Sequence, residues 1–180
     1  MQSRGTRSVR TLCYAETHPY RRSPPIKVEL INPFLAASET VFRQVTGHAL
    51  TAGDPTLHEA HLTSNDVTVL LGVAGAVHGH IILSMDTPLA LRVASAMMMG
   101  APMQAFDELG KSAVCELGNM ITGNAMTTLA TMGFPCDTTP PSIVIGRGAT
   151  ITMQIKTMIS VPMGGPLGTF ELMVALKEAQ

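Results

Sequence analysis

Apolar residues recur at two different periods along the chain, and the change of period separates helices from strands. The first helical pattern follows Asn32-Pro33, an N-cap residue and a proline suited to the first turn, and it stops at Gly47. A second helix follows Asp86-Thr87-Pro88, and Gly133 and Pro135 end a third, longer one. The predicted helices run from Asn32 to Gly47, from Thr87 to Gly100, and from Gln104 or Asp107 to Met132.

A period of two predicts strands. Val67 to Val73 alternate as in a half-buried strand, and Gly75-Ala76 turns this strand into a hairpin that ends at Leu83. Further strands are predicted at residues 56–62, 142–147, 151–161 and 170–176; in the fifth strand Ile151, Met153, Ile155, Ile159 and Val161 share one face. The order α-β-β-β-α-α-β-β-β predicts an α/β (α+β) fold, with helices packed on a largely antiparallel sheet.

The composition predicts one domain preceded by a basic extension. The chain has 180 residues, of which 46% are hydrophobic, enough for one packed core. Residues 1–25 carry five arginines against one glutamate and end in Ser23-Pro24-Pro25, so we expect them to be disordered, with the domain spanning 26–180. This domain holds seven Lys or Arg against twelve Asp or Glu, which argues against a nucleic-acid partner.

The cysteines and the hydrophobic runs indicate the cellular compartment of the protein. Three cysteines without paired spacing are typical of free thiols in a reducing compartment. No apolar run reaches eighteen residues, so we expect no membrane span and a cytoplasmic protein. His78 and His80 alternate on one strand, with His58 and His61 upstream, but no further ligand at zinc spacing accompanies them. Surface histidines are the favoured interpretation, and no metal site is expected.

The longest predicted helix carries the candidate site. At 100° per residue, Ser112, Glu116, Asn119 and Gly123 fall within a stripe about 60° wide. We expect an apolar face on the opposite side, formed by Val114, Leu117, Ile121, Ala125, Thr128 and Met132.

Three glycines interrupt the same helix, each at a cost of about 1 kcal/mol relative to alanine. For Gly118 we favour close packing on the sheet. Gly123 lies in the polar stripe, where it keeps the surface low enough for another protein's backbone to approach. Glu and Asn on the wet side of a helix are ordinary, so spacing alone leaves a purely structural interpretation open.

The helix resembles a known signature. Ser112-x-x-x-Glu116-x-x-Asn119, continuing to Ala125, is similar to the signature helix of the chemotaxis phosphatases CheC, CheX and FliY. The resemblance extends over about residues 26–177, including Lys27 to Phe34 and Met97 to Gly100. In the first helix, Ser38-Glu39 is not followed by an Asn three residues after Glu39, and a single site points to the CheX branch.

The resemblance implies a hydrolase that removes the aspartyl phosphate of a CheY-type response regulator and so ends a chemotaxis signal. In such an enzyme Asn119 would position the attacking water, Glu116 would pair with a receiver lysine, and Ser112 and Gly123 would contact the partner. The receiver would supply Mg²⁺, and the protein would need no cofactor of its own. The terminal strands carry few inward charges or prolines that block edge pairing, and the resemblance implies that the protein forms a homodimer through its sheet.

Two other functions stay open. One is a docking module, as in flagellar switch proteins, that binds a phosphorylated receiver without hydrolysing it. The other is a regulator outside motility that acts on a different receiver. Retention of both Glu116 and Asn119 favours the enzyme.

Overall fold

An antiparallel sheet forms the centre of the structure, a computed structural model that describes residues 28–179. The predicted extension over residues 1–25 lies outside the described residues. Each predicted strand is present, and two short strands, β1 and β5, accompany them. The strands are β1 (Thr51–Ala52), β2 (Thr56–Thr63), β3 (Val67–Gly75), β4 (Val77–Met85), β5 (Cys136–Thr138), β6 (Ser142–Ile145), β7 (Thr150–Gly165) and β8 (Gly168–Glu178).

The order of the strands differs from their order in the sequence. Neighbouring strands follow the order β1-β7-β8-β4-β3-β5, with β2 also paired to β7 and β6 to β3. Every pairing is antiparallel, as predicted. Because β8 lies between β7 and β4, and β7 between β8 and the short strands β1 and β2, the expectation of open edges at these terminal strands is wrong. The edges are the shorter strands β1, β2, β5 and β6.

The helices begin at the residues that cap them. Asp86 caps α2, where its Oδ1 accepts from the backbone N–H of Leu89 at 2.8 Å. The predicted cap at Asn32 is wrong by one residue: Ile31 is the N-cap, because a preceding 3₁₀ turn leads directly into the helix. Gly47 ends that helix with a φ of 74°, as expected for a left-handed C-terminal glycine. The helical elements are η1 (Val28–Leu30), α1 (Asn32–Thr46), α2 (Thr87–Met97) and α3 (Glu108–Thr131).

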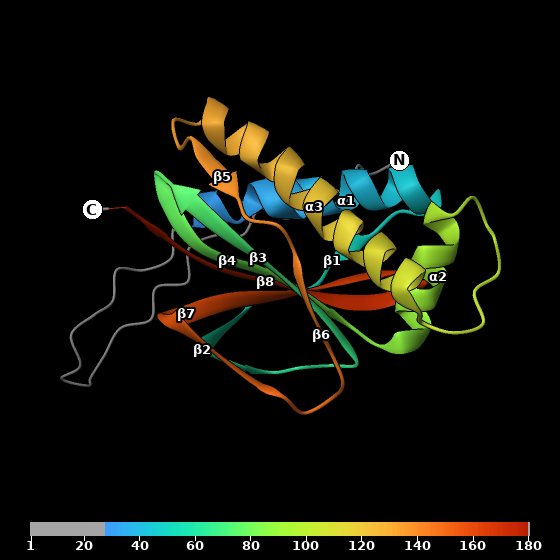
Figure 1. Cartoon of the computed structure of the whole chain (residues 1–180). Coiled ribbons are helices and arrows are strands. Elements are labelled where there is room, and N and C mark those ends of the chain that lie inside the picture. Colours follow the sequence, from blue (N-terminus) through green and yellow to red (C-terminus); the bar gives the residue numbers. More distant parts are fainter. Residues whose placement is uncertain (1–27, 180) are drawn as a thin grey trace, which may run out of the picture.

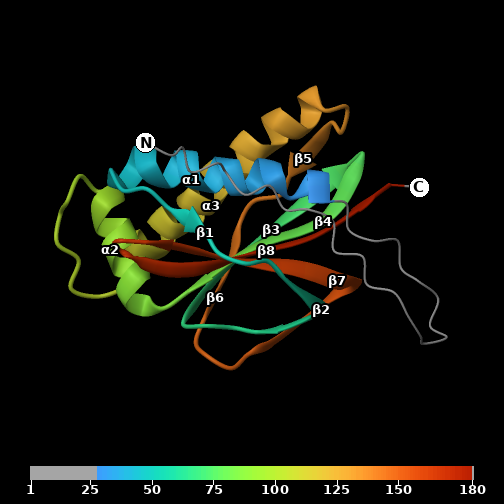
Figure 2. The ribbon, with the colours of Figure 1, turned by 180° about the vertical axis from the view of Figure 1, so that it is seen from behind.

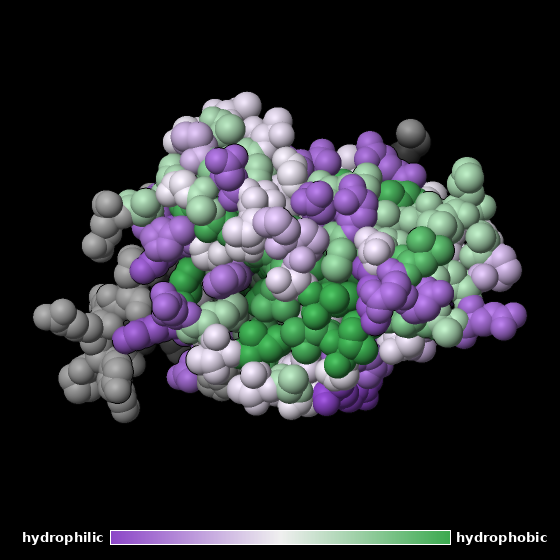
Figure 3. All heavy atoms as spheres, in the orientation of Figure 1, coloured by the Kyte–Doolittle hydropathy of each residue, from purple (hydrophilic) through white to green (hydrophobic). Residues whose placement is uncertain are grey.

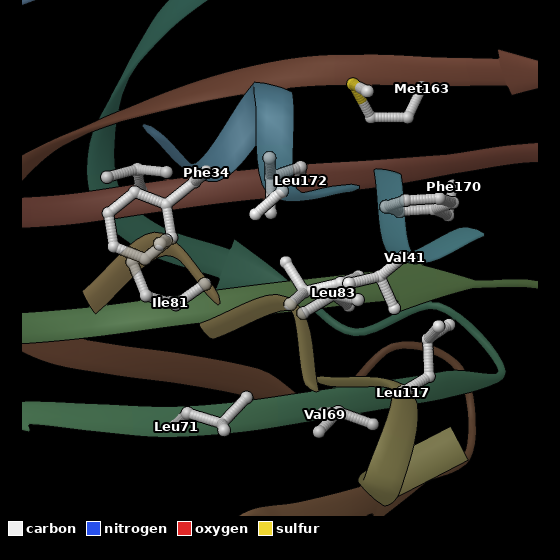
Figure 4. Close-up of a cluster of buried hydrophobic side chains, with 14 of the residues drawn as sticks. Phe34, Val41, Val69, Leu71, Ile81, Leu83, Leu117, Met163, Phe170 and Leu172 are labelled. Atoms are coloured by element: carbon white, nitrogen blue, oxygen red, sulfur yellow. The ribbon is translucent and has the colours of Figure 1, made fainter. Parts of the chain in front are cut away.

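The main core lies between the sheet and two helices. Figures 1 and 2 show α1 and α3 on one side of the sheet and α2 at one end of it. Side chains from α1 and α3 meet those of strands β3, β4, β7 and β8 in this layer, as Figure 4 shows. Phe34, Val41 and Leu117 are completely buried there against strand residues such as Leu71 and Leu83. This packing fixes the position of α3.

A second, smaller apolar cluster lies on the other face of the sheet. It contains Leu62, Ile82, Ile155, Met158, Met173 and Ala175. The predicted single face of β7 is wrong, because Ile151 and Ile155 join this cluster while Ile159 and Val161 face the main core. The pairing of β2 with β7 shifts register between Glu59 and His61, and such an irregularity moves the following side chains to the opposite face.

Candidate functional site

Helix α3 starts from a well-defined cap. Asp107 Oδ1 accepts hydrogen bonds from the backbone N–H groups of Leu109 and Gly110, both at 3.1 Å. Gly110 also leaves room for the preceding loop, because an added Cβ would lie 2.9 Å from the ring of Phe106. The cap thus satisfies two backbone N–H groups that have no partner within the helix, and it fixes where α3 begins.

The buried face of α3 sits directly on the sheet. A Cβ at Gly118 would lie 3.1 Å from Leu71 Cδ1 and 3.3 Å from Val69 Cγ1, which are both on β3. Close packing on the sheet is therefore confirmed for this glycine. It brings the helix axis nearer to β3 than alanine would allow.

Four of the six residues expected on the apolar face are buried, and two are exposed. Val114, Leu117, Ile121 and Ala125 are fully buried. Thr128 and Met132 are exposed, and Met126 and Leu129 are buried instead. The last turns of α3 pack beside β5, where Cys136 Sγ lies 3.1 Å from Met126 Sδ. The buried face therefore turns toward β5 near the end of the helix.

The polar stripe of α3 faces solvent. Its members, Ser112, Glu116, Asn119 and Gly123, are all exposed. Within residues 28–179, the side chains of Ser112, Glu116 and Asn119 form no hydrogen bond or ion pair. No atom lies within 4 Å of the Cβ that Gly123 would carry. The stripe is thus a low, open surface with a carboxylate and an amide one turn apart.

Neither the neighbouring lysine nor the two described thiols add a reactive group to the stripe. Lys111 is paired with Glu108 at 2.6 Å on the same helix. Burial raises the pKa of Cys115, and burial together with the nearby charge of Asp137 raises the pKa of Cys136. A raised pKa keeps both thiols protonated at neutral pH, so neither is suited to nucleophilic attack.

Other candidate ligands do not converge. His78 and His80 are half-buried on β4, and His58 is exposed on β2. Among the described side chains, no three His, Cys, Asp or Glu residues lie together in a way that could hold a metal ion. On α1, Ser38 is buried and Glu39 half-buried.

One exposed residue near the stripe was missed in the sequence. Leu109 is 51% exposed in the first turn of α3. At 100° per residue it lies about 60° from Ser112, on the same side of the helix as the stripe. A helical projection that included apolar residues would have found it, because a leucine on a polar face is out of pattern.

The sequence matches that of chemotaxis phosphatases. The family model for the chemotaxis phosphatase CheX matches residues 67–163, from β3 into β7. A relative from Thermotoga maritima, CheY-P phosphatase CheX, is 36% identical over an alignment of 136 residues, and the match covers 73% of this chain and 87% of the relative.

Solved structures agree with this match. The chemotaxis protein CheX from Desulfovibrio desulfuricans superimposes with a TM-score of 0.74 and 26% identity, over 84% of this chain and all of that one (100%). CheX in the CheX–CheY–BeF3–Mg²⁺ complex from Borrelia burgdorferi gives a TM-score of 0.65 and 31% identity, over 84% of this chain and 100% of that one. The fold therefore places the protein in the class of chemotaxis phosphatases. The polar face of its longest helix, α3, is exposed.

Within this class, the chain belongs to the CheX family. The sequence resemblance to the CheX branch is confirmed by the family model and by the relative from T. maritima. In the part of the chain that the structure describes, no helix is long and apolar enough to cross a membrane.

Proposed function

We propose that this protein hydrolyses the aspartyl phosphate of a CheY-type response regulator. The T. maritima relative is a CheY-P phosphatase. The B. burgdorferi relative occurs in a complex with CheY, and BeF3 in that complex has the shape and charge of a phosphoryl group. The T. maritima relative is 36% identical over 73% of this chain, and this similarity supports the transfer of its activity.

The observation that carries the proposal is the exposure of Glu116 and Asn119 side by side on α3. Neither side chain has a hydrogen-bond or ion-pair partner within residues 28–179, and both are exposed. A buried face packed on β3 holds the helix that carries them. Polar groups that are rigidly presented and unpaired are ready to enter a pocket on another protein.

Asn119 positions the water that attacks phosphorus. Its amide oxygen accepts a hydrogen bond from the water and its Nδ2 donates one to the partner, without adding negative charge beside the phosphoryl group. The water oxygen bonds to phosphorus as the bond from phosphorus to the aspartyl oxygen breaks. The products are inorganic phosphate and the free carboxylate. An acyl phosphate is already activated, so alignment is the main requirement.

The other stripe residues hold the receiver in place. Glu116 carries the only formal charge of the stripe, and we assign it to a lysine of the receiver, since a carboxylate beside the phosphoryl group would be repelled. Ser112 contributes a hydrogen bond at the rim. Gly123 has nothing within 4 Å of its absent Cβ, so it lets the receiver's backbone approach α3 closely.

The receiver supplies the Mg²⁺. The complex of the B. burgdorferi relative contains Mg²⁺ together with CheY. On the stripe, Glu116 is the single carboxylate, whereas Mg²⁺ requires octahedral oxygen ligands, usually including more than one protein or phosphate group. The residues of the stripe therefore do not fit a magnesium site of their own.

The test is phosphate release from a purified, phosphorylated CheY-type receiver. Asn119→Ala should keep receiver binding but lose hydrolysis, whereas Glu116→Ala should weaken both, with binding reduced by about 2–5 kcal/mol for one partner of a desolvated charge pair. Asn124→Ala is a matched control, because Asn124 is an exposed amide on the same helix whose Nδ2 donates to Met120 O at 3.0 Å. Full activity of Asn119→Ala would reject the catalytic assignment.

The same assay separates the alternatives. Binding that depends on phosphorylation, with no phosphate release by the wild-type protein, would favour the docking module. A panel of receivers identifies the substrate, and activity limited to a receiver outside motility would place the protein in another signalling system.

We further propose that the protein forms a homodimer through its sheet. In Figures 1 and 2 all helices lie away from the face that bears the second apolar cluster, and Figure 3 shows hydrophobic surface gathered below α3. Leu70, Ile151 and Met153 are only partly buried on this face. An apolar area of this kind is typical of an interface between proteins. Sedimentation at micromolar concentration tests this, and a monomer would contradict it.

A further inference from the structure

We propose that Leu109 is an apolar anchor for the receiver and helps to determine which receiver is bound. The proposal rests on the proposed function, because it assumes that a receiver covers the polar stripe of α3. It assigns Leu109 to binding rather than to the hydrolytic step. The anchor would contact a hydrophobic part of the receiver's surface beside its phosphorylated pocket.

Leu109 stands apart from the other exposed hydrophobic residues. Five large hydrophobic side chains are exposed in the described part of the chain, namely Leu57, Met99, Leu109, Met132 and Ile145. Leu57 and Ile145 belong to strands β2 and β6, and Met99 lies between α2 and α3. Met132 caps α3 on the side opposite the stripe, about 200° from Ser112. Leu109 alone among them shares the side of α3 on which Glu116 and Asn119 lie.

A receiver centred between Glu116 and Asn119 reaches as far as Leu109. At about 1.5 Å per residue, Leu109 is roughly 10 Å from Glu116 and 15 Å from Asn119 along the helix axis. A standard interface covers about 800 Å² on each partner, which corresponds to a disc roughly 30 Å across. The first turn of α3 therefore falls inside the area that such a partner covers.

The local structure holds this leucine in place before binding. Its backbone N–H donates to Asp107 Oδ1, and Gly110 packs closely against Phe106. A residue whose backbone is already held loses little backbone entropy when a partner covers it. It can therefore contribute most of its hydrophobic contact to affinity.

The stripe is asymmetric, and this asymmetry would select among receivers. Toward the other end of α3 the exposed residues on this side are small, namely Gly123, Thr127 and Ala130. A large apolar contact is thus available only toward the N-terminus of the helix. The receiver that fits has a hydrophobic surface residue roughly 10–15 Å from its phosphorylated aspartate, on the side that faces Leu109.

The experiment compares Leu109→Ala with two control variants. Leu57→Ala removes an even more exposed leucine from β2, and Met132→Ala removes an exposed methionine from the other side of α3. The probe is a CheY-type receiver loaded with beryllium fluoride and Mg²⁺ for binding, and the same receiver phosphorylated for kinetics. Alanine favours helix, so Leu109→Ala should fold normally, which thermal denaturation checks.

The expected result is a rise of about tenfold in both Kd and KM for Leu109→Ala, with kcat within twofold of the wild-type value. Both controls should stay within twofold in every parameter. An unchanged Kd for Leu109→Ala, or an equal rise for Leu57→Ala, would overturn the anchor. If the wild-type protein binds the receiver but releases no phosphate, the proposed function fails while the Kd comparison still decides the anchor. Failure of the wild-type protein to bind any receiver would reject both.

Discussion

Gly123→Ala should make the protein more stable and less active. Gly123 lies in the interior of α3 and faces open space, because no atom lies within 4 Å of the Cβ that alanine would add. Alanine is favoured over glycine in a helix by about 1 kcal/mol. The free energy of unfolding should therefore rise by about 1 kcal/mol, which for a chain of this size raises Tm by roughly 2–4 °C.

Gly118→Ala supplies the comparison for stability. It makes the same chemical change in the same helix, but its Cβ would lie 3.1 Å from Leu71 Cδ1. Crowding of this kind offsets some or all of the gain in helix propensity. Urea denaturation of the two variants should thus give a larger free energy of unfolding for Gly123→Ala than for Gly118→Ala. Equal values would mean that α3 is not seated on β3 as described.

The activity of Gly123→Ala tests the role of the stripe. If the receiver's backbone packs against Gly123, one added methyl group overfills that contact at a cost of about 1–3 kcal/mol. The value of kcat/KM for the phosphorylated receiver should then fall by roughly 5- to 150-fold. A variant that is more stable and fully active would refute the assignment of Gly123 to the partner interface.

Three further predictions concern residues outside the stripe. Ser38→Ala removes a buried hydroxyl with no hydrogen-bond partner among the described residues, so the free energy of unfolding from urea titration should be unchanged or up to about 1 kcal/mol higher, not lower. Glu39→Ala should keep full phosphatase activity, since α1 carries no second Glu-x-x-Asn pair. The backbone N–H of Thr87 and the Arg147 guanidinium lower the pKa of Asp66, so this carboxylate stabilises the fold above its ordinary pKa of 3.8 and loses that contribution as the pH falls further. In acid denaturation, the free energy of unfolding of Asp66→Asn should therefore fall less with decreasing pH than that of the wild-type protein.

The sequence predicted the elements whose signals are local. Asp107 caps α3 and Asp86 caps α2 through their own side chains, and Gly47 ends α1 in a left-handed conformation. The exposure of Glu116 and Asn119 follows from helical periodicity over many residues. Such features depend on neighbours within one or two turns, which a single sequence contains.

Elements that depend on distant partners were missed or misplaced. β5 is three residues long and exists because Cys136 pairs with Gly75 on β3. Met126 is buried because β5 returns beside the end of α3. The change of face within β7 depends on its register with β2. Periodicity could not reveal these, because each is decided by a pairing between segments far apart in the sequence.

The sequence predicted the exposed polar stripe of α3 but not the exposed leucine beside it. Ser112, Glu116, Asn119 and Gly123 follow from the resemblance and from their shared helix face. Leu109 has no counterpart in that motif. It draws attention only because its side chain is 51% exposed in the structure. Exposure of an apolar residue is a tertiary property, and the first turn of a helix can bury a leucine or leave it free.

The central place of β8 has a consequence for synthesis. β8 is made after every other described strand, yet it lies between β7 and β4, and its residue Glu178 pairs with Val77. A nascent chain that has not yet released this segment from the ribosome lacks the strand that joins the two halves of the sheet. Pairing across such a distance in sequence is slow, so the incomplete protein exposes β4 and β7 to chaperones and to aggregation until translation has passed β8.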